Sequence, residues 1–117
     1  MTLAELASPR FTVLEIESLK EQIIKTESLL NAAQGGQKAT LLGLIERMKH
    51  RISTLEERSQ RIQTAIRESI SDAEILEMIR LFQNGWTWRR ICKTVYGYDS
   101  HEACRTRVCR VIADITF

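Results

Sequence analysis

Apolar residues recur with a coiled-coil spacing through the first half of the chain, and this pattern constrains the fold more than any other feature. Two stretches, 11–33 and about 38–69, place apolar or small residues alternately three and four positions apart, which is the period of a helical seam. Paired glycines in Gln34-Gly35-Gly36-Gln37 interrupt the pattern once, because they favour a turn over a continuing helix. So short a connection predicts an antiparallel helical hairpin. The seam positions are Ile16, Leu19, Ile23, Thr26, Leu30 and Ala33, and then Leu41, Ile45, Met48, Ile52, Leu55, Ser59, Ile62 and Ile66.

The two arms of this hairpin have unequal lengths. At 1.5 Å per residue, the first helix spans about 35 Å and the second about 48 Å. The last turns of the second helix therefore need another partner, either the C-terminal residues or a second subunit. Because a two-helix hairpin buries too little apolar surface to be stable alone, we expect a homo-oligomer, with a dimer favoured. Docking of another protein on the heptads is the alternative.

Three shorter helices are predicted after residue 70. Ser71-Asp72-Ala73-Glu74 has the pattern of a capping box with the Ser71 hydroxyl at the N-cap, and Asn84-Gly85 is a typical helix exit. Thr87 can cap a short helix that ends near Val95, and Asp99-Ser100-His101-Glu102 is a second capping-box pattern opening a last helix to about residue 115. Three short helices with tight glycine turns are typical of a helix-turn-helix.

These patterns predict an all-α protein, a long antiparallel helical hairpin followed by a three-helix helix-turn-helix domain. We expect an N-terminal tail at 1–10, the hairpin at 11–70 and the helix-turn-helix at 71–117. Hydrophobic residues make up 44% of the chain and charged residues 27%, which excludes a disordered chain. The net charge of +2 argues little by itself, but residues 85–117 hold six basic and three acidic side chains, a net of +3.

The last predicted helix has two different faces. Small and polar residues opposite its apolar side, with arginines at the edges, suit a helix that lies in a DNA major groove, since short side chains allow close approach to the bases. The predicted core side comprises Cys104, Val108, Val111, Ile112 and Ile115, and the opposite side comprises Glu102, Ala103, Thr106, Cys109 and Arg110. We expect phosphate contacts from Arg89, Arg90 and Lys93, and groove contacts from Ser100, His101, Glu102, Arg105, Thr106, Arg107 and Arg110. If these residues only form a solvated surface, no DNA binding follows.

The stretch Ile79–Ile112 resembles the C-terminal module of a family of small phage-encoded proteins. These pair an N-terminal coiled coil with a helix-turn-helix similar to region 4 of bacterial sigma factors, and they include or border the RinA-like late transcription activators. The resemblance lies in Gly85-Trp86-Thr87-Trp88, in Ile91, in Gly97 and in the R-x-R-V-x-R run Arg105–Arg110. The chain departs from the family at Arg89 and Arg90, where glutamate is frequent, and at Cys92, where alanine is usual.

The resemblance implies a phage or prophage DNA-binding protein that regulates transcription, with double-stranded DNA and RNA polymerase as partners. Two alternatives stay open: a packaging protein of the small-terminase type, which also combines a helix-turn-helix with helical hairpins, and an adaptor whose C-terminal module docks on another protein. Oligomer size distinguishes the first two, because packaging proteins of this type form rings.

Other functional classes have little support in the sequence. His101, Cys104 and Cys109 have the spacing H-x2-C-x4-C, which matches no standard zinc pattern, so we expect no metal and no cofactor. We find no phosphate loop, nucleophile motif or carboxylate pair that predicts an enzyme. Three cysteines without a C-x-x-C pair indicate reduced thiols and a cytoplasmic location, and no apolar run approaches the ~20 residues of a membrane span. Trp86 and Trp88 are expected to pack in the core rather than to stack on bases.

Overall fold

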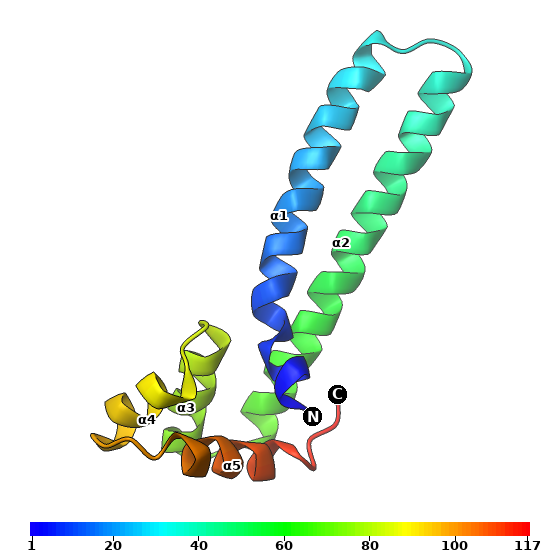
Figure 1. Cartoon of the computed structure of the whole chain (residues 1–117). Helices are drawn as coiled ribbons and strands as arrows, with labels where there is room; N and C mark the ends of the chain where they lie inside the picture. The colour runs from blue at the N-terminus through cyan, green and yellow to red at the C-terminus, as the bar shows by residue number, and fades with distance from the viewer. The chain divides into compact units, whose positions relative to one another are not determined.

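The computed structural model describes all 117 residues as five α-helices joined by short connections, without β-strands (Figure 1). The predicted all-α fold, a long helix pair followed by shorter helices, is confirmed. The residues group into two compact units, a hairpin unit formed by 12–58 and a terminal unit formed by 1–11 together with 59–117. No helix has both the length and the apolar character that crossing a membrane requires. The helices are α1 (Leu3–Ala32), α2 (Gly36–Ser69), α3 (Ala73–Gln83), α4 (Trp88–Tyr96) and α5 (His101–Ile112).

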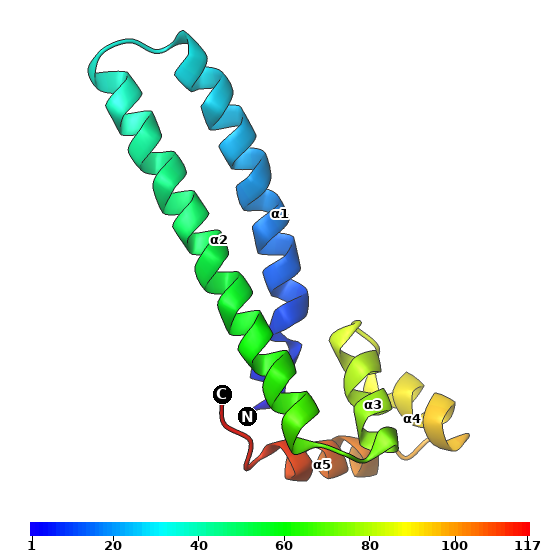
Figure 2. The same ribbon diagram turned by 180° about the vertical axis from the view of Figure 1, so that it is seen from behind.

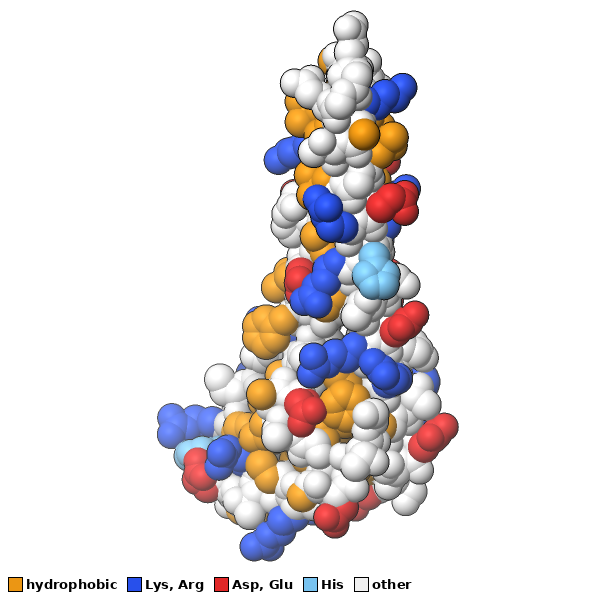
Figure 3. All heavy atoms as spheres, turned by 90° about the vertical axis from the view of Figure 1, so that its right-hand side faces the viewer, with side chains coloured by type: hydrophobic (Ala, Val, Ile, Leu, Met, Phe, Trp, Pro, Cys, Tyr) orange, Lys and Arg blue, Asp and Glu red, His pale blue; other side chains and the backbone are white.

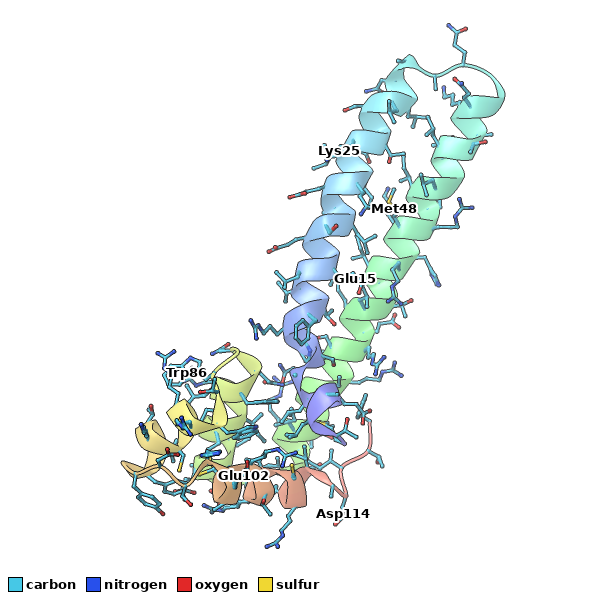
Figure 4. The ribbon with its side chains drawn as sticks, viewed as in Figure 1. Glu15, Lys25, Met48, Trp86, Glu102 and Asp114 are labelled. Atoms are coloured by element: carbon cyan, nitrogen blue, oxygen red, sulfur yellow. The ribbon has the colours of Figure 1, made fainter.

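In the hairpin unit, α1 and α2 run antiparallel and side by side (Figure 2). Between residues 16 and 33, the positions withdrawn from solvent are the six predicted seam positions and no others, which confirms the heptad pattern. Ile23, Ile45 and Met48 are buried together, and Met48 points from α2 towards α1 (Figure 4). The buried Thr26 hydroxyl donates to the Gln22 carbonyl oxygen at 2.7 Å, so this polar seam residue has a partner.

In the terminal unit, the ends of the long helices share one core with α3, α4 and α5. Leu6 of α1 and Ile62 of α2 are fully buried there, and the last turns of α2 add Ile66 and Ile70. The predicted need of these turns for a further partner is thus met by the C-terminal residues of the same chain. The rest of this core consists of Ala65, Ile75, Met78, Ile79, Leu81, Ile91, Cys92, Cys104, Val108, Ile112 and Ile115.

The prediction that residues 1–10 form a tail before the first helix is wrong, because α1 already begins at Leu3. Thr2 and Glu5 form a reciprocal capping box, in which the Glu5 N–H donates to Thr2 Oγ1 at 3.1 Å and the Thr2 N–H donates to Glu5 Oε1 at 3.0 Å. Pro9 has no N–H for the Glu5 carbonyl oxygen, but the Ser8 hydroxyl donates to this oxygen at 2.7 Å. The helix therefore passes through the proline.

The two capping boxes predicted in the C-terminal third are also wrong. The N-cap of α3 is Asp72 rather than Ser71, and its Oδ1 accepts from the backbone N–H groups of Glu74 and Ile75. Ser100 occupies the N-cap position of α5 without a side-chain capping bond. Its backbone N–H instead donates to Cys92 Sγ at 3.2 Å, which ties the turn to the buried thiol of α4. The sequence pattern identifies the helix starts but not the groups that cap them.

The remaining ends follow the predicted turn chemistry more closely. Asn84 is the C-cap of α3 and is followed by Gly85 at φ 90°, and Gly97 is the C-cap of α4 with φ 80°; both glycines have left-handed conformations that favour glycine. Thr87 caps α4, as predicted, by accepting from the Arg90 N–H. α5 ends at Ile112, before the predicted residue 115, and the Met1 ammonium group donates to carbonyl oxygens at this end.

Candidate nucleic-acid interface

One side of α5 packs in the terminal core and the other faces solvent. Cys104, Val108 and Ile112 are buried, as the helical wheel predicts. Val111, predicted for the core, is 38% exposed, because the core faces the side of the helix centred between Cys104 and Ile112 and Val111 lies at its edge. Of the predicted groove residues, Glu102, Arg105, Thr106, Arg107 and Arg110 are exposed and His101 is half-buried. On the side predicted to lie opposite the core, Ala103 is exposed and Cys109 is half-buried.

Helix α4 exposes three cations on the side opposite its buried Ile91 and Cys92. They are Arg89, Arg90 and Lys93. The Arg90 guanidinium lies over the Trp86 ring, 3.6 Å from the ring centroid, a favourable cation–π position. Trp88 stacks on Phe82 with ring centroids 4.7 Å apart, and both tryptophans pack against the terminal core. The interpretation of the tryptophans as core residues is confirmed.

Asp99, in the turn between α4 and α5, joins two of the predicted site residues. Its Oδ1 lies 3.0 Å from His101 Nδ1, and its Oδ2 lies 3.2 Å from Arg89 Nε. The hydrogen bond from His101, followed by the charge of Arg89, lowers the pKa of the Asp99 carboxyl below its ordinary value. Arg89 and His101 thus share one acid that the sequence reasoning did not include.

Glu102, in the first turn of α5, forms two weaker ion pairs. Its carboxylate lies 3.8 Å from Arg105 Nη1 and 3.7 Å from His101 Nε2, and its side chain is 74% exposed. Exposed pairs at these separations contribute little to stability, so solvent or an incoming ligand can replace them at small cost. Glu102 points outward from the start of α5 (Figure 4).

Arg107 is held by the fold more firmly than the other predicted cations. It donates to Asp72 Oδ2 and to Glu74 Oε2, each at 3.3 Å, and to the Tyr96 hydroxyl. These three partners come from the start of α3 and the end of α4. Burial raises the pKa of the Tyr96 phenol, and a hydrogen bond to Glu74 raises it further. The guanidinium therefore connects all three short helices.

Three predicted cations, Arg90, Lys93 and Arg110, form no ion pair within the chain, and Thr106 is exposed on the same helix as Arg110. Ser100 is half-buried, and its N–H is occupied by Cys92. Basic and acidic side chains are interspersed on the face shown in Figure 3, with no extended patch of one sign on that face. Because the net charge of the chain is only +2, attraction of a polyanion would depend on a few local cations.

The sequence reasoning missed the acids that engage the predicted cations. Asp72 follows the residue to which the capping-box pattern assigned the N-cap, and Asp99 was assigned an N-cap rather than an ion pair; an aspartate at a helix start was the available signal. Nothing in the sequence indicated Tyr96 as a partner of Arg107, because the contact joins two different helices. No group of three His, Cys, Asp or Glu side chains is arranged to hold a metal ion.

No known family model, no curated protein and no solved structure matches the chain.

Proposed function

We propose that the chain binds double-stranded DNA by inserting α5 into the major groove. The observation that carries the proposal is the solvent side of α5, where the small residues Ala103 and Thr106 lie exposed on either side of Arg110. A helix with short side chains at its centre can approach base edges, and arginines beside it can reach guanine or phosphate oxygens. The three-helix arrangement, in which α4 contacts both α3 and α5, is the architecture that helix-turn-helix proteins use for this purpose.

The ion pairs of the predicted cations indicate which of them can contact DNA. Arg90, Lys93 and Arg110 have no acidic partner within the chain. Arg90 lies over the Trp86 ring, so Lys93 and Arg110 are the cations that cost least to transfer to phosphates. Arg89 and Arg105 are in exposed pairs that phosphate oxygens can replace. Arg107 serves the fold, since contact with DNA would require it to leave Asp72 and Glu74. Arg107 is therefore removed from the predicted set of DNA contacts.

Glu102 is the proposed base-reading acid. It stands in the first turn of α5, exposed, and a carboxylate at this place can accept a hydrogen bond from the cytosine N4 amino group. Near phosphates the same carboxylate is repelled, so Glu102 favours a limited set of base sequences rather than raising overall affinity. The resemblance to phage-encoded coiled-coil proteins with region-4-like modules supports transcription regulation as the biological role.

The direct test measures fluorescence anisotropy of a random 25-base-pair duplex at low salt. We expect nonspecific dissociation constants of about 10⁻⁴–10⁻⁶ M for the unmodified chain. The variant Arg105→Ala/Arg110→Ala should weaken binding at least about tenfold, through the loss of two phosphate or base contacts. The matched control Arg61→Ala/Arg67→Ala removes the same charge from exposed positions of α2 and should leave binding within about twofold.

Equal weakening by both double variants would mean that only net charge matters, and the assignment to α5 would fail. Absence of binding by the unmodified chain at low salt would refute DNA binding itself. If binding depends on α5, selection of a specific sequence from a random library follows, and Glu102→Ala should relax the preference for cytosine at one position of that sequence.

A further inference from the structure

The hairpin unit has too little core for its length. Only Ile23, Ile45 and Met48 form a buried cluster there, with Leu19, Leu30 and Ile52 partly buried around it. Small units of this size normally need a larger core, a disulfide, a metal or a partner to stay folded. The three cysteines all lie in α4 and α5, outside this unit. Additional apolar burial on the hairpin is therefore expected from outside the unit.

Large apolar side chains remain on both faces of the hairpin. At 3.6 residues per turn, Leu29 and Leu44 each lie about a fifth to a quarter of a turn from the seam of their helix, on the same side of the hairpin. Ile24 and Leu42 lie on the opposite side. Exposed fractions are 63% for Leu29, 37% for Leu44, 64% for Ile24 and 45% for Leu42. Substitutions of apolar residues on one face can therefore be compared with similar substitutions on the other.

The face with Leu29 is also hollowed. A shallow apolar groove at the end of the hairpin is lined by Leu29, Leu41, Ala32 and Ala33, and its remaining lining comes from Gly36, Gln37 and Thr40. Small side chains at the rim allow another helix to approach closely. Another shallow hollow on the hairpin unit lies on α2 and is polar, with a lining of Glu46, Arg47, His50, Arg51 and Thr54.

The charges of the two arms favour a second copy of the hairpin as the partner of this face. The hairpin part of α1, residues 12–32, holds four glutamates and two lysines, a net of −2. The hairpin part of α2, residues 36–58, holds five basic and three acidic residues, a net of +2. A second copy related by a two-fold axis parallel to the hairpin places its α2 against α1 and its α1 against α2. Unlike charges then meet along both helix pairs, as an isologous interface allows.

The available area is adequate for such a dimer. About twenty residues per arm give a face about 30 Å long, and two helices side by side make it about 20 Å wide. The resulting footprint, on the order of 600 Å², approaches the ~800 Å² per partner of a standard stable interface. We propose that two copies of the chain associate through the face of the hairpin unit that carries Leu29 and Leu44, forming a four-helix bundle. This inference does not rest on DNA binding.

The test compares two matched double variants of the full chain by sedimentation equilibrium. We expect the unmodified chain to have twice its 13.5 kDa mass at micromolar concentrations. Leu29→Gln/Leu44→Gln should raise the dimer dissociation constant at least about tenfold, because it places polar groups in the buried part of the interface. The control Ile24→Gln/Leu42→Gln removes similar apolar groups from the other face and should leave the constant within about twofold. Circular dichroism verifies that both variants keep the same helix content.

A second measurement tests the charge argument. Raising sodium chloride from about 0.05 M to about 0.5 M should weaken the dimer several-fold, since salt screens the attraction between the arms. Four results overturn the proposal: a monomer at about 100 µM, a ring-sized mass, greater weakening by the control than by the test variant, or a dimer that strengthens with salt. The last would indicate a purely apolar contact in another register.

Discussion

Arg107 Nη2 lies 3.3 Å from Oδ2 of Asp72, whose other carboxylate oxygen caps the first turn of α3. One aspartate therefore fixes the start of α3 and, through Arg107, the middle of α5. Glu74 and the Tyr96 hydroxyl complete the contacts of the guanidinium. Because α5 carries the proposed base-reading side, the orientation of that side depends on a residue 35 positions before Arg107 in the chain.

Two replacements of Asp72 separate the contribution of its N-cap from that of its ion pair with Arg107. Asp72→Ala removes both and should lower the free energy of unfolding by about 1–2 kcal/mol, most of it from the lost cap. Asp72→Asn keeps a capping oxygen and loses only the charge, and it should cost less than about 1 kcal/mol, because both partners of the pair are 42–49% exposed and solvent screens them. Urea denaturation followed by tryptophan fluorescence measures both. Equal losses would show that the cap contributes nothing.

Arg107 and Arg110 stand three residues apart but should respond differently to truncation. Arg107→Ala removes the contacts between α3, α4 and α5 and should lower the urea midpoint of unfolding, although solvent screens these exposed ion pairs. Arg110→Ala has no ion pair to lose and should leave stability within about 0.5 kcal/mol while weakening DNA binding. Denaturation and anisotropy on the same samples give the comparison. A larger stability loss for Arg110→Ala would contradict the assignment of Arg107 to the fold.

The long helices could be predicted from the sequence because one physical signal dominates them. Burial along the hairpin follows the heptad positions from Ile16 onward, since each arm has only one side to bury. The start of α1 was missed although Thr2-Leu3-Ala4-Glu5 has the capping-box pattern, because Pro9 suggested a boundary. The same pattern at Ser71 and Asp99 does not form its capping bonds, since neighbouring aspartates and a buried thiol compete for the same groups.

The exposed residues of the candidate site could be predicted from the sequence, but their ion pairs could not. The wheel of α5 correctly separated Cys104, Val108 and Ile112 from the exposed arginines. Which cations stay available depends on acids brought near them by the packing of three helices, as for Asp72 and Arg107. The contacts of Arg107 with Asp72 and Glu74 join residues more than thirty positions apart, and no local pattern encodes them.

Alanine replacement of two glycines should have opposite effects on stability. Gly43 lies inside α2 with open space around an added β-carbon, so Gly43→Ala should stabilise the chain by up to about 1 kcal/mol. Gly97 also has open space but a φ of 80°, and Gly97→Ala should destabilise by about 1 kcal/mol through backbone strain alone. Thermal and urea denaturation measure both changes. A stabilised Gly97→Ala variant would mean that α4 ends in another conformation.

The Asp99 carboxyl should titrate below its ordinary pKa, and His101 should be the main cause. His101→Ala removes the largest contribution and should move the midpoint upward, and Arg89→Ala should move it upward by less. Because the pKa is lowered in the folded chain, the stabilisation is present above the ordinary aspartate pKa and is lost as pH falls through the folded value. Carboxyl-carbon NMR titration measures the midpoints. The control Arg110→Ala should leave Asp99 unchanged, and an unchanged midpoint in His101→Ala would disprove the assigned cause.

The three thiols should differ in their reaction with iodoacetamide. Cys92 is inaccessible and Cys104 is 3% exposed, and burial, together with the neighbouring Cys92 thiol, raises the pKa of Cys104 to about 12. Since the thiolate is the reactive form, both should react only when the terminal unit opens, at least about a hundredfold more slowly than the half-buried Cys109 at pH 8. Mass spectrometry of timed samples measures the rates, and concentrated urea should make all three react alike. Rapid labelling of Cys104 in the folded chain would show that α4 and α5 separate readily, and the proposed groove-binding helix would then lack the fixed support on which its reading of DNA depends.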